Sequence, residues 1–471
     1  MRLADLAGIG GDSRVTGFAI DHRKVAPGTV FGAFRGSVSN GEDFIPLAVG
    51  AGAVAVVARP GVPVHGAAHI ASEEPRREFA RLAANFFKPF PETVVAVTGT
   101  NGKTSSVELT RQLWRMAGHH AASIGTLGVT TADDRATTGL TTPDIVTFLS
   151  NMAGLAREGV TRAAFEASSH GLSQYRTEGL PVRAGAFTNF TRDHLDYHET
   201  MEAYFEAKMR LFDEVIDPKG AAVIWTDDPR SDQVCSRADA RGLRLLTVGR
   251  RGETLRLVNR EPTQLGQRLT LEVEGKSHQI ELPLIGAYQA ANALTAAGLV
   301  LATGGDLAQI LASLPRVQGV RGRLERAVIT RSGAPVYVDY AHTPDAIEAA
   351  IEALRPHARD RLIIVFGAGG DRDMGKRAEM GAVAARLADL AIVTDDNPRS
   401  EDPAAIRRDI LEGAGEAREV AGRREAIAEA VAQAGPGDIV LLAGKGHEQG
   451  QIVGDKVLPF DDVTVARECA A

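Results

Sequence analysis

The strongest constraint on the fold of this 471-residue chain is a stretch that joins a strand, a glycine loop and a helix start. Residues 94–98 include four β-branched residues, which predicts a buried strand. Gly99 and Gly102 follow, and a helical pattern of apolar residues begins after Lys103 and Thr104. Such a unit can bind phosphate, because backbone N–H groups and the helix dipole point at the anion. Lys103 would offset β- or γ-phosphate charge, and the Thr104 hydroxyl would reach Mg²⁺.

This loop matches the usual P-loop pattern only in part. Val97 stands where that pattern has its first glycine, so an ordinary turn between strand and helix remains an alternative to nucleotide binding. The fuller string TGTNGKT, from Thr98 to Thr104, resembles the ATP loop of the Mur ligase family. The resemblance implies that ATP is bound by Gly99, Thr100, Asn101, Gly102, Lys103, Thr104 and Ser105.

Composition narrows the class of protein. The formal net charge is −7 and no basic cluster is interleaved with aromatic residues, which argues against a general nucleic-acid binder. The two cysteines, Cys235 and Cys469, are far apart, so a disulfide framework is not expected. No signal-peptide core and no apolar run of about 18 residues is present. We expect a cytoplasmic monomer that acts on small molecules without membrane insertion, with roughly two to four domains.

Residues 1–87 are expected to form a small α/β domain. The order of residues from Asp21 and Arg23 through the Pro27-Gly28 turn resembles the uridine-nucleotide-binding domain of Mur ligases that add the third peptide residue. In that domain a serine between the Asp and the Arg contacts the diphosphate of the UDP-MurNAc-peptide, and His22 stands at that place here. A surface ion pair between Asp21 and Arg23 is the alternative. Prolines at 89 and 91 end the helix expected over 78–87 and mark the boundary.

Residues 88–314 are expected to form a central, P-loop ATPase-like domain with a parallel sheet. A short strand at 163–167 carries Glu166, and an acidic residue at the end of a central strand can ligate Mg²⁺. The Ser-Ser-His run that follows lacks the G-x-S-x-G context of a hydrolase. The hydroxyl-rich loop at 137–144 could be a plain turn. The family resemblance instead implies contacts to the UDP-MurNAc-peptide from Thr141, Thr142, Ser168, Gln174 and Arg176.

Three further residues bear on a possible metal site, namely His194, His198 and Lys208. His194 and His198 have the spacing of a zinc motif, but Leu195 replaces its essential glutamate, so local hydrogen bonding in a loop or a magnesium ligand fits better. Lys208 lies on an apolar helix face, where a lysine must be paired, modified or extended towards solvent. The resemblance implies that CO₂ carbamylates Lys208. It also implies the catalytic residues Lys103, Lys208, Glu166 and His194, and the Mg²⁺ ligands Thr104, Glu166, His194 and carbamylated Lys208.

The rest of the central domain, from 213 to 290, is expected to consist mainly of strands and turns. Trp225 stands where the family pattern VxNxDD has asparagine. A helix should open near 287, and the resemblance assigns its Asn292 to the adenine base. The third domain, 315–471, begins with a string similar to the family's GRxE. The resemblance adds Arg323 of this string to the ATP-binding residues, and it adds Asp339 as well.

Strands expected near 334–338, 361–366, 390–394 and 438–443 end in glycines or charged residues and alternate with helices. This order predicts a doubly wound, Rossmann-like sheet with a site at its carboxyl edge. The string Asp-Asn-Pro-Arg at 396–399 resembles the signature of Mur ligases that add meso-2,6-diaminopimelate. Arginine forks suit its distal carboxylate, and a glutamate suits its ammonium group. The implied diaminopimelate-binding residues are Arg372, Asp396, Asn397, Pro398, Arg399, Gly444 and Glu448.

Together these motifs run from about residue 18 to 450 and predict an α/β protein of three domains. The resemblance implies a ligase that uses ATP and Mg²⁺ to join meso-diaminopimelate to the D-Glu γ-carboxylate of UDP-MurNAc-L-Ala-D-Glu through an acyl phosphate. Use of L-lysine instead, another ligase of the Mur or folylpolyglutamate type, and a non-catalytic P-loop protein are the alternatives. The last of these would not need Lys208 or a carboxylate-binding edge.

Overall fold

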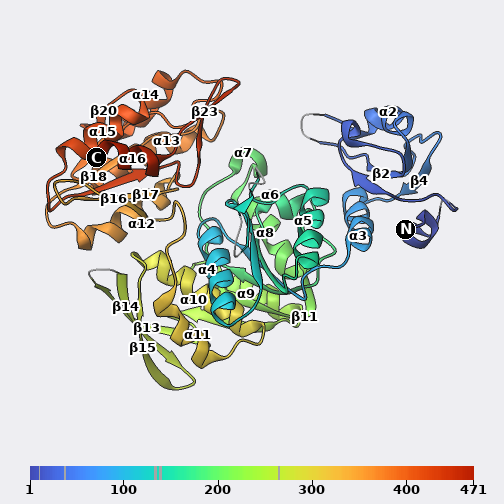
Figure 1. The fold of residues 1–471 in the computed structure, drawn as a ribbon, viewed down its shortest axis with the longest axis horizontal. Helices are drawn as coiled ribbons and strands as arrows, with labels where there is room; N and C mark the ends of the chain where they lie inside the picture. The colour runs from blue at the N-terminus through green and yellow to red at the C-terminus, as the bar shows by residue number, and fades with distance from the viewer. Residues whose placement is uncertain (10, 37–38, 132–134, 137–139, 264–265) are drawn as a thin grey trace.

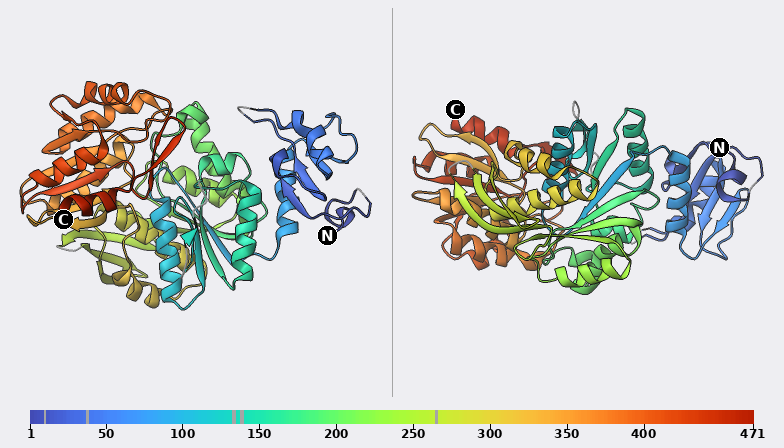
Figure 2. Two further views of the ribbon diagram at one scale, coloured as in Figure 1. Left: turned by 45° about the horizontal axis from the view of Figure 1, so that its top comes forward. Right: turned by 90° about the horizontal axis from the view of Figure 1, so that it is seen from below.

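The computed structural model describes residues 1–471 except 10, 37–38, 132–134, 137–139 and 264–265. Three sheets follow one another along the chain, each packed with helices, and the expected α/β fold class is confirmed. The first sheet lies at one end of the molecule and the third at the other, with the largest sheet between them (Figures 1 and 2). Among the described residues, no helix is long and apolar enough to cross a membrane.

The first sheet is parallel throughout, in the order β1-β2-β3-β4. Its helix α3 (Pro75–Phe87) buries Phe79, Leu82 and Ala83 and leads into the central unit. The expected helix at 78–87 therefore begins three residues earlier, with Pro75 in its first turn, where its missing N–H is harmless. The other elements are α1 (Leu3–Ala7), β1 (Gly17–Ala19), β2 (Thr29–Gly32), α2 (Ile45–Gly50), β3 (Ala53–Ala58) and β4 (Ala68–Ala71).

The central sheet has parallel strands in its middle and antiparallel hairpin strands at both edges, in the order β15-β14-β13-β12-β11-β10-β5-β9-β6-β7-β8. The expected strand before the glycine loop is β5, and Val94 to Val97 are fully buried, as strands covered on both faces must be. Val97 pairs with Glu166 of the neighbouring β9, which sets that carboxylate beside the loop. The strands are β5 (Thr93–Thr98), β6 (Ala121–Gly125), β7 (Gly128–Thr130), β8 (Arg135–Ala136), β9 (Arg162–Glu166), β10 (Val182–Phe187), β11 (Ile216–Trp225), β12 (Arg244–Gly249), β13 (Leu255–Thr263), β14 (Gly266–Val273) and β15 (Lys276–Leu282).

Strands and turns predominate between 213 and 290, as expected, but α9 (Ser231–Ala240) is a helix that the sequence pattern did not indicate. Val234 and Ala238 are its buried apolar residues, one turn apart, and the remaining positions are mostly polar. So few apolar residues give a weak helical period, and packing against β11 and β12 stabilises the helix. The other central helices are α4 (Lys103–Met116), α5 (Ile145–Arg157), α6 (Ser169–Ser173), α7 (Leu195–His198), α8 (Met201–Arg210), α10 (Ala287–Ala302) and α11 (Leu307–Ser313).

The third sheet has the order β16-β17-β21-β18-β19-β20, with β16 antiparallel and the others parallel. Because Asp339 pairs with Ala443 and Phe366 with Val393, the loops that follow these strands leave from one edge. The elements are β16 (Glu325–Ile329), β17 (Pro335–Asp339), α12 (Pro344–Leu354), β18 (Leu362–Phe366), α13 (Arg377–Leu387), β19 (Leu390–Val393), α14 (Pro403–Ala414), β20 (Arg418–Glu419), α15 (Arg423–Gln433), β21 (Ile439–Ala443), the hairpin β22 (Gly450–Val453) and β23 (Lys456–Pro459), and α16 (Asp462–Ala470).

Candidate active site

The glycine loop between β5 and α4 requires its two glycines. Gly99 has φ +146°, and a Cβ there would lie 1.9 Å from Oγ1 of Thr188. Gly102 has φ +84° and immediately precedes α4, and its Cβ would lie 2.3 Å from Oδ1 of Asn292. Side chains at these positions would therefore clash as well as strain the backbone. The loop therefore packs closely against Thr188, which follows β10, and against Asn292 of helix α10.

A cavity of about 520 Å³ lies at this loop and is lined by residues of the central and third units. The residues expected to bind ATP gather here, although their sequence positions span more than half the chain. Thr100 to Ser105 supply the loop side, and Asn292, Arg323 and Asp339 supply the far side. Glu166, His194, Lys208, Thr141 and Ser168 also line it. Gly99 is adjacent in the chain but is not itself among the lining residues.

Two lysines share one backbone carbonyl beside this cavity. Lys103 Nζ donates to the carbonyl oxygens of Gly99, at 2.9 Å, and Thr100, at 2.7 Å. Lys208 Nζ donates to the same Gly99 oxygen at 2.8 Å and lies 4.3 Å from the Tyr204 ring centroid. Lys208 is only 1% exposed. Burial, reinforced by the charge of Lys103, holds the pKa of Lys208 well below its usual value, so its amine favours the neutral, nucleophilic form.

The metal ligands implied by the sequence lie on the same cavity. Glu166 is buried, and its Oε1 accepts the Thr126 N–H at 2.7 Å. His194 has φ +54° at the start of α7, and burial lowers its pKa to about 3, so its ring is neutral and able to ligate a metal. The described residues contain no cluster of three or more His, Cys, Asp or Glu that could hold a metal. Glu166 is the one unmodified carboxylate among the implied ligands, and Asp193 also lines the cavity beside His194. Such a set fits Mg²⁺, which takes few protein ligands and completes its shell with phosphates and water.

The third unit reaches the glycine loop through Arg323. Its guanidinium donates to Thr104 Oγ1 at 3.0 Å and lies 4.7 Å from the centroid of the Tyr340 ring. Asp339 supports this segment, because its Oδ2 accepts the Leu324 N–H at 2.6 Å. Burial raises the pKa of Asp339 to about 6, with Arg323 opposing the rise. The two units therefore meet where the phosphates of a nucleotide would lie.

The residues expected to hold the UDP-MurNAc-peptide form a connected group beside Glu166. Thr142 Oγ1 donates to the Glu166 carbonyl at 2.7 Å and lies 3.0 Å from Ser168 Oγ. Arg176 donates to the Thr142 carbonyl at 2.8 Å and to Gln174 Oε1 at 2.7 Å. Thr141 joins the group through Thr126, at 3.2 Å between hydroxyl oxygens. The preceding part of this loop, at 137–139, lies outside the described residues.

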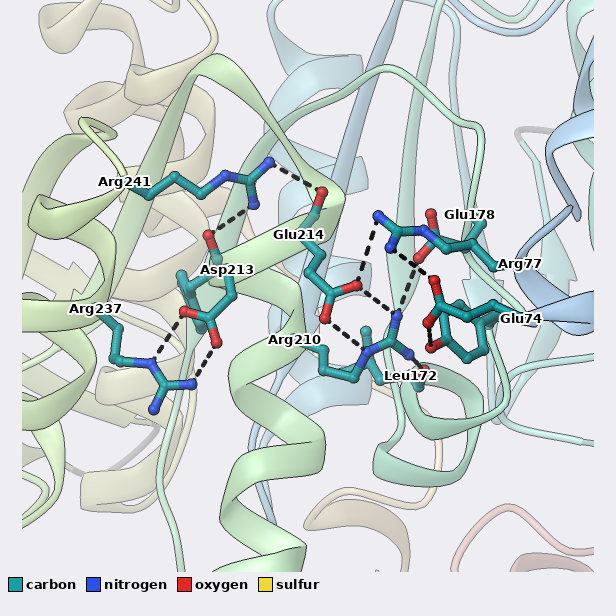
Figure 3. A network of polar contacts seen from close by, with 11 residues as sticks. Glu74, Arg77, Leu172, Glu178, Arg210, Asp213, Glu214, Arg237 and Arg241 are labelled. Carbon is teal, nitrogen blue, oxygen red and sulfur yellow. Dashed lines mark hydrogen bonds and ion pairs between the residues drawn. The ribbon is translucent and has the colours of Figure 1, made fainter. Parts of the chain in front are cut away.

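Arg210, the last residue of α8, joins that helix to residues 172–178, the segment that carries Gln174 and Arg176 (Figure 3). It donates to the Leu172 carbonyl and to carboxylate oxygens of Glu178, at 3.1 Å, and Glu214, at 2.9 Å. Arg77 of α3 lies 3.8 Å from the Glu214 carboxylate, so the network also includes the first unit. The sequence pattern gave no sign of Arg210, because its partners lie at scattered positions in the chain.

His22 is not among the residues that line the cavity. Its ring stacks on Phe44 with centroids 4.5 Å apart, within the first unit. Asp21 and Arg23 form the ion pair that was the alternative for this motif, with Arg23 Nη2 2.7 Å from Asp21 Oδ2. Arg23 lowers the pKa of Asp21 to about 2.

The carboxyl edge of the third sheet brings together most of the residues expected to bind diaminopimelate. Asn397 Nδ2 donates to Glu448 Oε2 at 2.7 Å, and Arg399 Nη1 donates to the Gly370 carbonyl at 2.8 Å. A Cβ on Gly444 would lie 2.6 Å from Asp396 Oδ2, and one on Gly369 would lie 2.8 Å from Arg399 and 3.7 Å from Arg372, so these side chains are neighbours. Pro398 lies between Asn397 and Arg399 in the chain.

Lys445 is fully buried at this edge and was not expected from the sequence. A lysine between two glycines gives no local indication of which residues it will contact in the fold.

Comparison with known proteins identifies relatives of the whole chain. Residues 97–300 match the Mur ligase middle domain, and residues 322–446 match the Mur ligase, glutamate ligase domain. The UDP-N-acetylmuramoyl-L-alanyl-D-glutamate--2,6-diaminopimelate ligase of Zymomonas mobilis is 61% identical over 97% of this chain and 95% of that protein. The protein of the same name from Bradyrhizobium diazoefficiens is 51% identical over 98% and 97%. A solved structure of that name is 32% identical, with a TM-score of 0.72, over 100% of this chain and 98% of the other.

Proposed function

The chain belongs to the Mur ligase family, and from this premise we propose that it joins meso-2,6-diaminopimelate to the D-Glu γ-carboxylate of UDP-MurNAc-L-Ala-D-Glu, with hydrolysis of ATP to ADP and phosphate. The product is a peptidoglycan precursor. The observation that carries the proposal is the 61% identity to a ligase named for this reaction, over 97% of the chain. The buried Asn397 and the partly exposed Glu448 beside Arg399 support it, because donors and an acceptor are offered to one zwitterionic amino-acid centre.

The reaction proceeds in two steps. The γ-carboxylate attacks the γ-phosphorus of ATP, forming an acyl phosphate and releasing ADP. The amine of diaminopimelate then attacks the acyl carbon, an amide bond forms, and phosphate leaves with the amine proton passing to solvent or a base. Lys103 offsets phosphate charge, and Arg323 brings a second cation from the third unit to the same loop.

The remaining ATP contacts follow from the cavity. The N–H groups of Gly102 to Ser105 at the start of α4 are the proposed phosphate donors, because those of Thr100 and Asn101 already donate to Asn189 and Gly99 shapes the loop. Asn292 is proposed to contact the base, and Asp339 holds the Arg323 segment. Bound Mg²⁺, held by Thr104, Glu166, His194 and carbamylated Lys208, would neutralise phosphate charge. Carbamylation is the addition of the neutral Lys208 amine to CO₂, which yields a carboxylate and a proton. The burial of Lys208 and its lowered pKa support this modification.

The roles of the other site residues are proposed on the same basis. Thr141, Thr142, Ser168, Gln174 and Arg176 hold the peptide end of the UDP-linked substrate next to Glu166, and His22 contacts its diphosphate. We assign UDP-MurNAc binding to residues 1–87, ATP binding to residues 88–314 and amino-acid binding to residues 315–471, and each range contains one of the three large sheets. A monomer in the cytoplasm, where ATP and nucleotide sugars are available, is the proposed state.

The test is phosphate release with ATP and UDP-MurNAc-L-Ala-D-Glu, comparing meso-diaminopimelate with L-lysine. Turnover with diaminopimelate alone is expected, because lysine lacks the distal carboxylate that Arg399 and Arg372 would bind. Turnover with lysine alone would retain the ligase reaction and overturn the specificity. The absence of turnover with either amino acid would overturn the proposed function.

A further inference from the structure

A fully buried lysine lies among the residues proposed to bind diaminopimelate. Lys445 follows β21, and its side chain is 0% exposed. Its Nζ donates to Asn397 Oδ1 at 3.0 Å and to Glu448 Oε2 at 3.1 Å, and it lies 3.8 Å from Asp396 Oδ1. A buried ammonium group is unfavourable unless carboxylates and acceptors compensate it. Asp396 and Glu448 supply the negative charge that compensates Lys445, and the Asn397 oxygen supplies a further acceptor.

The amide of Asn397 has a fixed orientation. Its Oδ1 accepts from Lys445 Nζ and from the Ile452 N–H, at 2.9 Å, and both of these groups can only donate. The amide oxygen must therefore face them, and Nδ2 must face Glu448, to which it donates at 2.7 Å. The second hydrogen on Nδ2 is then a donor for a ligand carboxylate.

The hydrogen bonds of the Glu448 carboxylate also fix which of its two oxygens faces a ligand. Both of its hydrogen bonds, from Lys445 and Asn397, end on Oε2. Within the described part of the chain, Oε1 accepts no hydrogen bond, and the side chain is 29% exposed. Oε1 can therefore accept from the ammonium group of an amino acid, while the Arg399 fork and the Asn397 amide donate to its carboxylate.

We infer that Lys445 is a positioning residue that selects the distal amino-acid centre of diaminopimelate, an inference that rests on the proposed function. Lys445 does not contact the substrate. It directs Oε1 of Glu448 and the free N–H of Asn397 towards the substrate by holding Oε2 and Oδ1. It also balances one of the two negative charges of Asp396 and Glu448, so that the site accepts a zwitterion and not a cation alone.

The test compares Lys445→Met, which keeps the chain length and removes the charge, with Lys456→Met at an exposed position on β23. Steady-state assays would vary one substrate at a time. For Lys445→Met we expect the KM for meso-diaminopimelate to rise roughly tenfold to a hundredfold, with the KM values for ATP and the UDP-linked substrate unchanged. The preference for meso-diaminopimelate over L-lysine in kcat/KM should fall by a similar factor. Lys456→Met should match the wild type in both respects.

A double variant addresses folding. Lys445→Met combined with Glu448→Gln removes one positive and one negative charge together, so the net charge of the site is unchanged. If Lys445 acts through Glu448, the double variant should have about the same KM for diaminopimelate as Glu448→Gln alone. Additive effects of the two substitutions on the KM for diaminopimelate would overturn the inference. Equal increases in the KM values for all three substrates, together with a lower Tm, would also overturn it, because they indicate a structural role. Wild-type enzyme that does not use diaminopimelate would overturn the proposed function itself, whereas normal wild-type turnover with an unaffected Lys445→Met would overturn only this inference.

Discussion

Arg399 combines an unusual backbone conformation with a position at the edge of the third sheet. Its φ is +52°, a value that residues other than glycine rarely adopt, and the chain at this point pairs with Val453 of β22. Such outliers often lie at functional sites, where the surrounding structure enforces them. The geometry fits a side chain that must be aimed at a ligand.

We expect Arg399→Ala to raise the KM for meso-diaminopimelate roughly tenfold to a hundredfold, because a forked donor to a carboxylate is lost. The KM for ATP should not change. Steady-state kinetics with each substrate varied in turn would measure both. Arg408→Ala, at an exposed position on α14, is the matched control and should behave as the wild type. A change confined to the KM for ATP would contradict the role given to Arg399.

Lys208 is expected to carry a carbamate, because its buried amine has a lowered pKa and can add to CO₂. Enzyme in ¹³C-bicarbonate should give a carbamate carbon signal by NMR that Lys208→Met lacks. Lys208→Met should also lose kcat by roughly a hundredfold or more, since a charged group near the reacting phosphate is removed. Lys219→Met, at an exposed position, should keep the signal and the activity. An identical spectrum for wild type and Lys208→Met would rule out the modification.

The raised pKa of Asp339 predicts how the free energy of unfolding of this protein changes with pH. Its pKa is raised to about 6 by burial, so the folded state binds a proton more tightly than the unfolded state. The stabilisation from this proton is complete below about pH 4 and is lost as the pH rises to about 6. Asp339→Asn should therefore be more stable than the wild type at pH 8 by about 1–3 kcal/mol, and this gap should shrink towards pH 4. Urea unfolding at several pH values measures it, and a gap that grows on acidification would refute the argument. The exposed Asp360 offers the control Asp360→Asn, which should show no such gap.

At the scale of elements, the βα unit at 93–116 depends on the shape of its glycine loop. Gly99 and Gly118 both have positive φ, but only a Cβ at Gly99 would clash, whereas nothing lies within 4 Å of one at Gly118. Gly99→Ala should cost about 2–4 kcal/mol of unfolding free energy and abolish ATP binding, because the loop must move.

Gly118→Ala should cost only about 1 kcal/mol and leave ATP binding intact, since strain is its only penalty. Denaturant unfolding and isothermal titration with ATP would test both variants. Equal effects of the two substitutions would show that the close approach to Thr188 is unimportant.

Three elements show how far sequence patterns reach. The strand and helix of the βα unit follow from consecutive residues, so β5 and α4 form where expected. Helix α9 was missed because Val234 and Ala238 are too few to give a clear period, and its stability comes from the sheet beneath it. Local patterns thus predict elements that carry their own apolar stripe and fail for those that depend on neighbours.

At the scale of the whole molecule, Arg210 links the first unit to the loop of the central unit that carries Gln174 and Arg176, which are proposed to bind the substrate (Figure 3). Its guanidinium stacks 3.9 Å from the centroid of the Tyr175 ring, and the Tyr175 hydroxyl donates to Glu74 just before α3 at 2.8 Å. The same arginine pairs with Glu178, whose pKa is raised by burial. One side chain therefore joins α8, which carries Lys208, to the loop that carries Gln174 and Arg176.

Arg210→Met should lower the unfolding free energy by about 2–3 kcal/mol, because Glu178 is left without its partner. It should also raise the KM for the UDP-linked substrate while leaving that for ATP unchanged. Arg183→Met is the control: its side chain is 52% exposed and lies 3.6 Å from Asp217, and such surface pairs contribute about 0–1 kcal/mol. Similar stability losses for both variants would argue against a linking role for Arg210.

The sequence by itself determined the glycine loop, the order of the three sheets and the residues at the edge of the third sheet. These follow from neighbouring residues and from the rule that loops after parallel strands share one edge. Asn397, Arg399 and Glu448 could be placed together for that reason.

Only the tertiary structure decided which side chains pair within those loops. Lys445 meets Asn397 across 48 positions of sequence, and Arg323 meets Thr104 across 219. It also showed Asp21 bonded to Arg23, with His22 stacked on Phe44. No local pattern encodes such contacts, because the energy of a buried charge depends on partners that only the folded chain brings within hydrogen-bonding distance.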